Sequence, residues 1–147
     1  MAETSNRGPL TERNRLIKEN RVGDYISPNL ALGMVPVEFG AGTSRWAWKT
    51  QPDLALNPFG TIQGGYLAVF IDELLSSAIA SVLDEGEWAM TAEFKINFLR
   101  ALPPTALTGS ARVIRRSRTL AFLEAQVETE DGQIAVTASS TWAVMKR

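Results

Sequence analysis

The chain has 147 residues, enough for one domain with a buried core, and 45% of them are apolar. With 15 basic and 16 acidic residues, its near-neutral charge argues against broad nucleic-acid binding, which needs a clustered basic surface. There is no His and no Cys, which excludes disulfides, Cys/His metal sites, thiolate nucleophiles and imidazole bases. Any acid–base chemistry therefore falls to Asp, Glu, Lys or Tyr.

The amino-terminal residues 1–24 are charged and loosely patterned, and we interpret them as an arm or a short surface helix. Residues 11–20 could form that helix, with Leu16 and Ile17 as its apolar contacts. The opening residues lack the apolar centre of a secretory signal, and no apolar run reaches the ~20 residues of a membrane span. We expect a cytoplasmic protein without a membrane partner, whose main domain is residues 25–147.

Residues 33–50 are typical of two strands joined by the turn Gly40-Ala41-Gly42. Pro36 lies inside the first strand, which predicts an edge position because proline cannot donate to a neighbouring strand. A loop that carries proline and asparagine follows, over residues 51–63.

A buried helix is predicted next, opened by Gly64-Gly65 and stopped near Gly86. Apolar residues cover most of its sides, and a helix of that kind is typical of a core position. These residues are Leu67, Val69, Phe70, Ile71, Leu74, Leu75, Ala78, Ile79 and Val82.

After Gly86 the chain alternates with period two through four segments, interrupted at Pro103-Pro104 and at the hairpin signal Asp131-Gly132. The first segment is predicted to face inward with Ala92, Phe94, Ile96 and Phe98, and outward with Thr91, Glu93, Lys95 and Asn97. The other inward rows are Leu107, Gly109, Ala111 and Val113, then Ala121, Leu123, Ala125 and Val127, and finally Ile134, Val136, Ala138, Ser140, Trp142 and Val144.

Together these elements predict an α+β fold in which a curved antiparallel sheet of about five or six strands wraps one long central helix. An open sheet edge also favours pairing with a second copy of the chain. We therefore expect a homo-oligomer. The four tryptophans fit best in the core or at an interface.

The helix start is the first candidate site, because Gly64 and Gly65 leave backbone N–H groups unobstructed where they have no intrahelical partner. Such groups bind phosphate or polarise a carbonyl as an oxyanion hole. The alternative is that the glycines only permit tight packing.

The second candidate is Asp72, a carboxylate that follows Gly65 by seven residues and lies among apolar neighbours. Such a group can serve as a base. Glu73 is the competing carboxylate. It points about 100° further round the helix, and we interpret it as part of a solvated face while keeping it among the substrate-binding candidates.

Seven residues separate Gly65 from Asp72 by roughly 10 Å along the helix, too far for both to act on one carbonyl. Two antiparallel helices in a dimer would bring the glycines of one subunit to the aspartate of the other. Any catalytic site is thus predicted to be shared between subunits.

The motif Asn57-x-x-Gly60-x-x-Gln63-Gly64-Gly65, followed by Asp72 and Thr91, resembles the phenylacetate-pathway (PaaI-like) branch of the hotdog-fold thioesterases. The similarity runs from about Gly33 to the carboxyl terminus. It implies hydrolysis of an aliphatic or aryl acyl-CoA to free acid and CoA by a dimer or tetramer. No cofactor is implied beyond the CoA of the substrate, and no metal.

The resemblance also implies roles for the motif residues. Asp72 would activate water or attack directly, and the Gly64 N–H would bind the thioester carbonyl from the partner subunit. Asn57 would orient substrate or water, and Thr91 would support the reaction beside Asp72. The family commonly has His where this chain has Gln63, whose amide can replace a hydrogen bond but not a proton transfer. We expect a structural role for Gln63.

A basic turn at Arg115, Arg116 and Arg118 is either a clamp for CoA phosphates or a solvated hairpin tip. Two other functions remain open. One is a non-catalytic acyl-CoA binding or regulatory module. The other is a hotdog enoyl hydratase or dehydratase, against which the absence of His counts.

Overall fold

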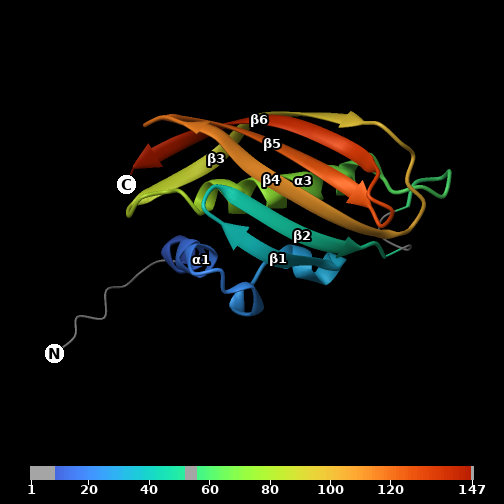
Figure 1. Ribbon diagram of the computed structural model, residues 1–147, viewed down its shortest axis with the longest axis horizontal. Helices are drawn as coiled ribbons and strands as arrows, with labels where there is room; N and C mark the ends of the chain where they lie inside the picture. Colours follow the sequence, from blue (N-terminus) through green and yellow to red (C-terminus); the bar gives the residue numbers. More distant parts are fainter. Residues whose placement is uncertain (1–8, 52–55, 147) are drawn as a thin grey trace.

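The computed structural model describes residues 9–51 and 56–146, in which a long helix lies against one face of a six-stranded antiparallel sheet (Figure 1). The helix is α3 (Gly64–Ala80). The strands are β1 (Met34–Gly40), β2 (Thr43–Lys49), β3 (Glu87–Phe98), β4 (Ala106–Arg116), β5 (Leu120–Thr129) and β6 (Ile134–Lys146). Short helices α1 (Pro9–Lys18), η1 (Val22–Asp24) and η2 (Pro28–Leu32) precede them. The predicted α+β architecture is confirmed.

The strand order is β1-β2-β4-β5-β6-β3, so β1 and β3 form the two edges of the sheet. The edge position predicted from Pro36 is confirmed. At the other edge, β3 pairs on one side only, with β6.

The core lies between α3 and the inner face of the sheet. Trp46 and Trp48 are fully buried there, and the Trp48 ring centroid lies 5.4 Å from that of Phe70 on α3. The helix approaches β4 closely at Gly109, where an added Cβ would lie 2.5 Å from a methyl carbon of Leu74. These contacts fix α3 against the strands.

Helix α3 ends at Ala80 rather than close to Gly86. The hydroxyl of Ser81 donates to the Ala78 carbonyl at 2.7 Å and accepts the Gly42 N–H at 2.7 Å. This ties the helix end to the β1–β2 turn. Gly86 lies in the following turn into β3, with φ of +77°.

A β-bulge in β3 corrects the alternation predicted for this strand. Thr91 pairs with Trp142 and Glu93 with Thr141, which leaves Ala92 as the extra residue. Because Trp142 is an inward residue of β6, Thr91 also faces the helix, on the same side as Phe94. The outward orientation predicted for Thr91 is wrong.

A second irregularity lies at the start of β6, where Val127 pairs with Val136 and Glu128 with Ile134. Ala135 is the extra residue and is buried, whereas Ile134 is 41% exposed. The inward orientation predicted for Ile134 is therefore wrong. The rest of that row is buried as predicted.

Helix α1 begins and ends two residues earlier than predicted, at Pro9 and Lys18. Its apolar contacts are those expected, because Leu16 and Ile17 are buried and Ile17 joins the same core cluster as α3. Lys18 also donates to the Leu83 carbonyl, near the carboxyl end of α3. Helix α1 thus packs on the rest of the molecule.

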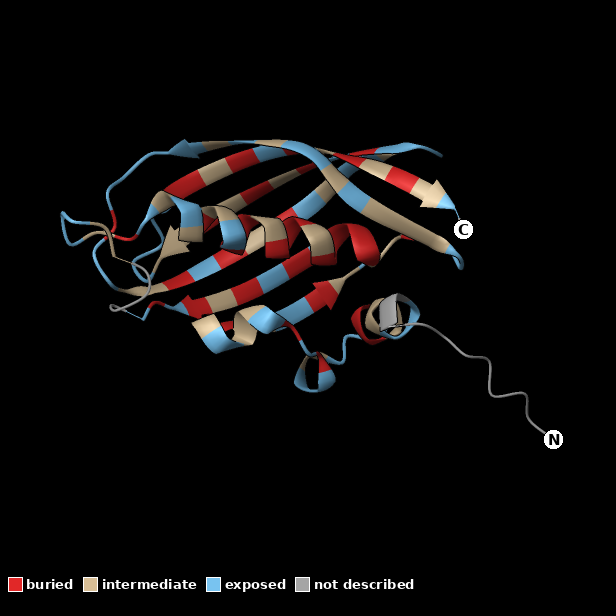
Figure 2. Ribbon diagram, turned by 180° about the vertical axis from the view of Figure 1, so that it is seen from behind, coloured by how far each residue is buried: buried red, intermediate tan, exposed pale blue. Residues whose placement is uncertain are grey.

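One stripe of α3 is less covered than the prediction of burial on nearly all sides implies. Gly65 and Val69 are exposed, and Asp72 and Ser76 are half-buried. In Figure 2 this helix lies in front of the sheet, and its amino-terminal half shows exposed and intermediate residues. Among the described residues, no helix is both long and apolar enough to cross a membrane.

Candidate active site

Asp72 lies on the open stripe of α3 and is held by β3. The hydroxyl of Thr91 donates to Asp72 Oδ1 at 2.8 Å, and no described residue donates to Oδ2. The bulge at Ala92 makes this contact possible, because it turns Thr91 toward the helix. One carboxylate oxygen is fixed, and the other can accept a proton.

A cavity of about 380 Å³ adjoins this carboxylate, between α1, α3, β3 and β6. Its walls are largely apolar, with Ile79, Leu83, Trp88 and Trp142 among them. That volume is near the lower end of the ~300–1,000 Å³ range of small-molecule sites. An organic group can therefore enter beside Asp72.

The start of α3 has the geometry of an anion or carbonyl site. The Gln63 carbonyl accepts the N–H groups of Tyr66 (3.0 Å) and Leu67 (3.3 Å). The preceding N–H groups of Gly64 and Gly65 have no intrahelical acceptor. An added Cβ at Gly64 would lie 3.2 Å from the Phe98 ring, so a glycine lets this ring approach closely.

Asn57 organises the loop before the helix rather than pointing freely outward. Its Oδ1 accepts the N–H groups of Phe59 (3.0 Å) and Thr61 (3.1 Å), and its Nδ2 donates to Thr61 Oγ1 at 2.7 Å. The side chain thus fixes the approach of the chain to Gly64. Gln63 differs, because its side chain is exposed and makes no capping hydrogen bond to the helix.

Glu73 is not on a solvated face, which corrects that interpretation. It is only 9% exposed, and its carboxylate accepts from Tyr25 Oη (3.1 Å), Ser27 Oγ (3.2 Å) and Asn29 Nδ2 (2.6 Å). These donors come from the segment between α1 and β1. Glu73 therefore fastens that segment to α3, while its neighbour Asp72 faces the cavity.

Arg13 of α1 also reaches this region, and the sequence interpretation missed it. Its Nη2 donates to Ser76 Oγ at 2.9 Å and its Nε to Tyr25 Oη at 2.8 Å. The spacing from Arg13 to Ile17 places both on one face of α1. That spacing was the available signal that Arg13 points toward the core.

The basic turn between β4 and β5 divides into two parts. Arg116 is mostly buried and pairs with Glu87 and Asp84, which gives its charge a structural partner. Arg115 and Arg118 are exposed and make no ion pair within the described chain. Only these two are free to meet a phosphate.

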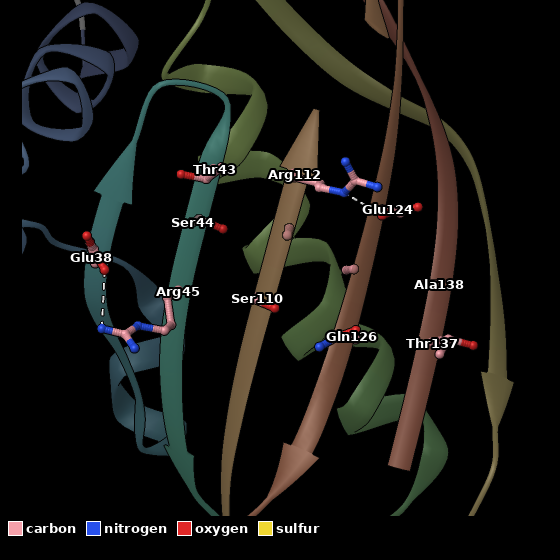
Figure 3. Close-up of a pocket in the computed structure, with 12 residues that line it drawn as sticks. Glu38, Thr43, Ser44, Arg45, Ser110, Arg112, Glu124, Gln126, Thr137 and Ala138 are labelled. Atoms are coloured by element: carbon pink, nitrogen blue, oxygen red, sulfur yellow. Dashed lines mark hydrogen bonds and ion pairs between the residues drawn. The ribbon is translucent and has the colours of Figure 1, made fainter. Parts of the chain in front are cut away.

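A larger hollow of about 600 Å³ lies on the outer face of the sheet, with α3 behind the strands (Figure 3). Its charged residues pair with each other, Arg45 with Glu38 and Arg112 with Glu124. Neither Asp72 nor Gly64 lines it. The hollow is therefore separate from the candidate active site.

Within one chain the two catalytic candidates do not meet. Eight residues of continuous helix separate Gly64 from Asp72 by roughly 12 Å along the axis. Within residues 9–51 and 56–146, no three acidic side chains converge where they could hold a metal ion.

The family model of the thioesterase superfamily matches residues 59–136, and the chain belongs to this superfamily. The matched span contains the helix start at Gly64, the carboxylate Asp72 and its partner Thr91. The predicted recognition and the assignment as a thioester-hydrolysing enzyme are confirmed at this level.

Solved structures place the fold with the hotdog proteins. A conserved protein of Pseudomonas aeruginosa is 27% identical, with a TM-score of 0.75 over 82% of this chain and 95% of that chain. A thioesterase family protein of Silicibacter pomeroyi is 20% identical, with a TM-score of 0.79 over 91% of this chain and 99% of that chain. The Escherichia coli PaaI protein, from the phenylacetic acid degradation operon, is 16% identical, with a TM-score of 0.77 over 90% and 96%.

Proposed function

We propose that this protein hydrolyses an aliphatic or aryl acyl-CoA to the free acid and CoA, at a site shared by two subunits. The observation that carries the proposal is the placement of Asp72. Its carboxylate is oriented by Thr91 beside an apolar cavity, on the open stripe of a helix whose first glycine N–H groups have no acceptor among the described residues.

Asp72 starts the reaction in either of two ways. As a base, it accepts a proton from a water molecule whose oxygen attacks the thioester carbonyl carbon. As a nucleophile, it attacks that carbon itself, and water then hydrolyses the resulting anhydride. In both routes the carbonyl π electrons move to oxygen. The C–S bond breaks when they return, and the CoA sulfur leaves as thiolate and takes up a proton.

The developing oxyanion needs donors that Asp72's own chain does not place nearby. We assign them to Gly64, and secondarily Gly65, of the partner subunit. Asn57 supports that donor by holding the loop in front of it. Arg115 and Arg118 remain candidates for CoA phosphates, since each lacks an ion-pair partner in the described chain.

The edge strand β3 supports the dimer. Its outer edge pairs with no other described strand over its 12 residues, and Met90, Phe98 and the following Leu99 are each more than half exposed. An exposed apolar edge is a site for strand pairing. Antiparallel pairing of two β3 strands would set the two α3 helices antiparallel, with the Gly64 end of one toward Asp72 of the other.

A mixing experiment tests the shared site. Asp72→Asn removes the base. Gly64→Pro removes one N–H at the first helical position, where proline is tolerated, and Gln63 already has the extended backbone that proline requires. Gly64→Ala is the matched control, because it adds a Cβ toward Phe98 but keeps the N–H. Release of CoA thiol is measured for each variant alone and for equal mixtures after subunit exchange.

Asp72→Asn is expected to lower kcat by about 10²- to 10⁴-fold, and Gly64→Pro by about 10²- to 10³-fold, with Gly64→Ala much milder. Mixed dimers contain one intact site, so mixing the two inactive variants should restore about one quarter of wild-type activity. No recovery in mixed dimers would contradict the shared site. Binding of acyl-CoA without thiol release by the wild type would contradict hydrolysis and favour a binding module.

A further inference from the structure

The cavity beside Asp72 has a cation in its wall that forms no ion pair with a carboxylate of residues 9–51 or 56–146. Arg13 lines the cavity and makes no ion pair with any described acidic residue. Its Nε and Nη2 are occupied by neutral hydroxyls, which leaves Nη1 without a described partner. Glu73 lies one hydrogen bond further away, behind the hydroxyl of Tyr25.

A second donor in the same wall is also unpartnered. Trp142 lines the cavity and is only 3% exposed, yet its indole N–H has no acceptor among the described residues. A buried polar group in a native structure is normally hydrogen-bonded. The missing partner of Trp142 is thus an acceptor that the described chain does not supply.

The position of Arg13 relative to the reacting carbon limits what it can bind. Arg13 is fastened to Ser76, which lies one helical turn, about 6 Å, beyond Asp72 on the same face. The CoA phosphates are separated from the thioester by the whole pantetheine arm, which is much longer than one turn. Because the phosphates are the only anionic groups of CoA, an anionic group that meets Arg13 belongs to the acyl part of the substrate.

We propose that Arg13 is a specificity-determining residue that selects short acyl groups ending in a carboxylate, with Trp142 as a second donor. The inference rests on the proposed function and adds the substrate class. The acyl chain is a few carbons long, because it spans one turn of α3. The guanidinium binds the terminal carboxylate, which it matches in charge and in planar geometry.

Matched acyl-CoA pairs test the inference. Succinyl-, glutaryl- and adipyl-CoA are compared with butyryl-, valeryl- and hexanoyl-CoA, and the readout is the ratio of kcat/KM within each pair. The wild type should favour at least one carboxylate-ended member by about tenfold or more. Arg13→Met should bring this ratio to about one, and Arg13→Lys should leave it intermediate, because lysine keeps the charge without the planar fork.

The matched control is Arg15→Gln, which removes a charge of the same helix that pairs with Glu12 and Glu19 and does not line the cavity. It should keep the wild-type ratio. Trp142→Phe should lower the ratio less than Arg13→Met, because one neutral donor is lost. Melting temperatures identify any variant that fails to fold. If Arg13→Met is such a variant, the kcat/KM ratios of the wild type and of Arg13→Lys still test the selectivity.

Two kinetic outcomes overturn the inference: no preference within any pair, or turnover of 4-hydroxybutyryl-CoA as efficient as that of succinyl-CoA. The latter would mean that a neutral oxygen suffices. Binding of succinyl- and butyryl-CoA to the Asp72→Asn variant is measured by calorimetry. It separates failure of the selectivity from failure of the proposed function. Tighter binding of succinyl- than butyryl-CoA without any wild-type turnover would support the selectivity and overturn the hydrolysis. Equal binding would overturn the selectivity itself.

Discussion

The hydroxyl of Thr91 on β3 donates to Asp72 Oδ1 on α3 at 2.8 Å, and it is the only described hydrogen bond to that carboxylate. The contact joins the central helix to the edge strand that is expected to meet the partner subunit. It fixes the direction of the carboxylate without neutralising its charge.

Removing this hydroxyl should impair turnover without unfolding the protein. Thr91→Val keeps the shape of the side chain and loses the hydrogen bond, so kcat should fall by about tenfold, as expected for one hydrogen bond to a charged group. Thr91→Ser keeps the hydroxyl and should retain most activity. Steady-state kinetics on both variants give the test. If Thr91→Val had the same kcat as Thr91→Ser, a role for the hydroxyl would be excluded.

Glu73 should matter for stability more than for chemistry. Glu73→Ala leaves the donors of Tyr25, Ser27 and Asn29 without their acceptor, and should lower the free energy of unfolding by about 2–4 kcal/mol. Urea denaturation measures this. Exposed Glu85 provides the control, and Glu85→Ala should change stability by less than about 0.5 kcal/mol. A stable Glu73→Gln variant with no activity would instead make Glu73 the catalytic carboxylate.

Stability should fall in alkali because of Tyr25. Burial raises the pKa of its phenol from 10.0 to about 12, with Glu73 adding to the rise and Arg13 opposing it. The unfolded chain therefore releases this proton first. The stabilisation is complete below about pH 10 and is lost as pH rises toward about 12, a change of about 3 kcal/mol. Urea denaturation at several pH values should show a shallower decline for Tyr25→Phe, and parallel declines would contradict this.

The close approach of α3 to β4 should make Gly109 intolerant of a side chain. A Cβ there would lie 2.5 Å from Leu74 Cδ1 and 2.9 Å from Phe70 Cε1. Gly109→Ala should cost about 1–3 kcal/mol by overpacking. Gly23→Ala is the comparison, since its added Cβ meets no atom within 4 Å. Similar melting temperatures for the two variants would mean that α3 can move away from β4 without loss of stability.

Periodicity in the sequence predicted the elements and most inward rows, because burial imposes a period of two on strands and leaves an apolar helix in the core. It failed where one extra residue enters a strand. The bulge at Ala92 has no mark in the sequence, so Thr91 was assigned to the outer face. The same holds for Ile134, displaced by the bulge at Ala135.

The candidate site was predicted in part. Gly64 and Asp72 could be found because glycine pairs and acidic residues stand out in an apolar helix. The roles of Glu73 and Arg116 could not, since their partners lie far away in the sequence, 44 to 48 residues for Glu73 and 29 and 32 for Arg116. Long-range pairing of charges depends on the finished fold, and local spacing does not encode it.

The wall built by α1 has a consequence for how such proteins diverge. The residues that perform the proposed reaction are on α3 and β3, whereas Arg13 belongs to a helix that precedes the sheet altogether. Substitutions in that helix can retune which molecule is accepted while the reaction stays the same. Two chains with identical reactive residues can therefore serve different metabolites.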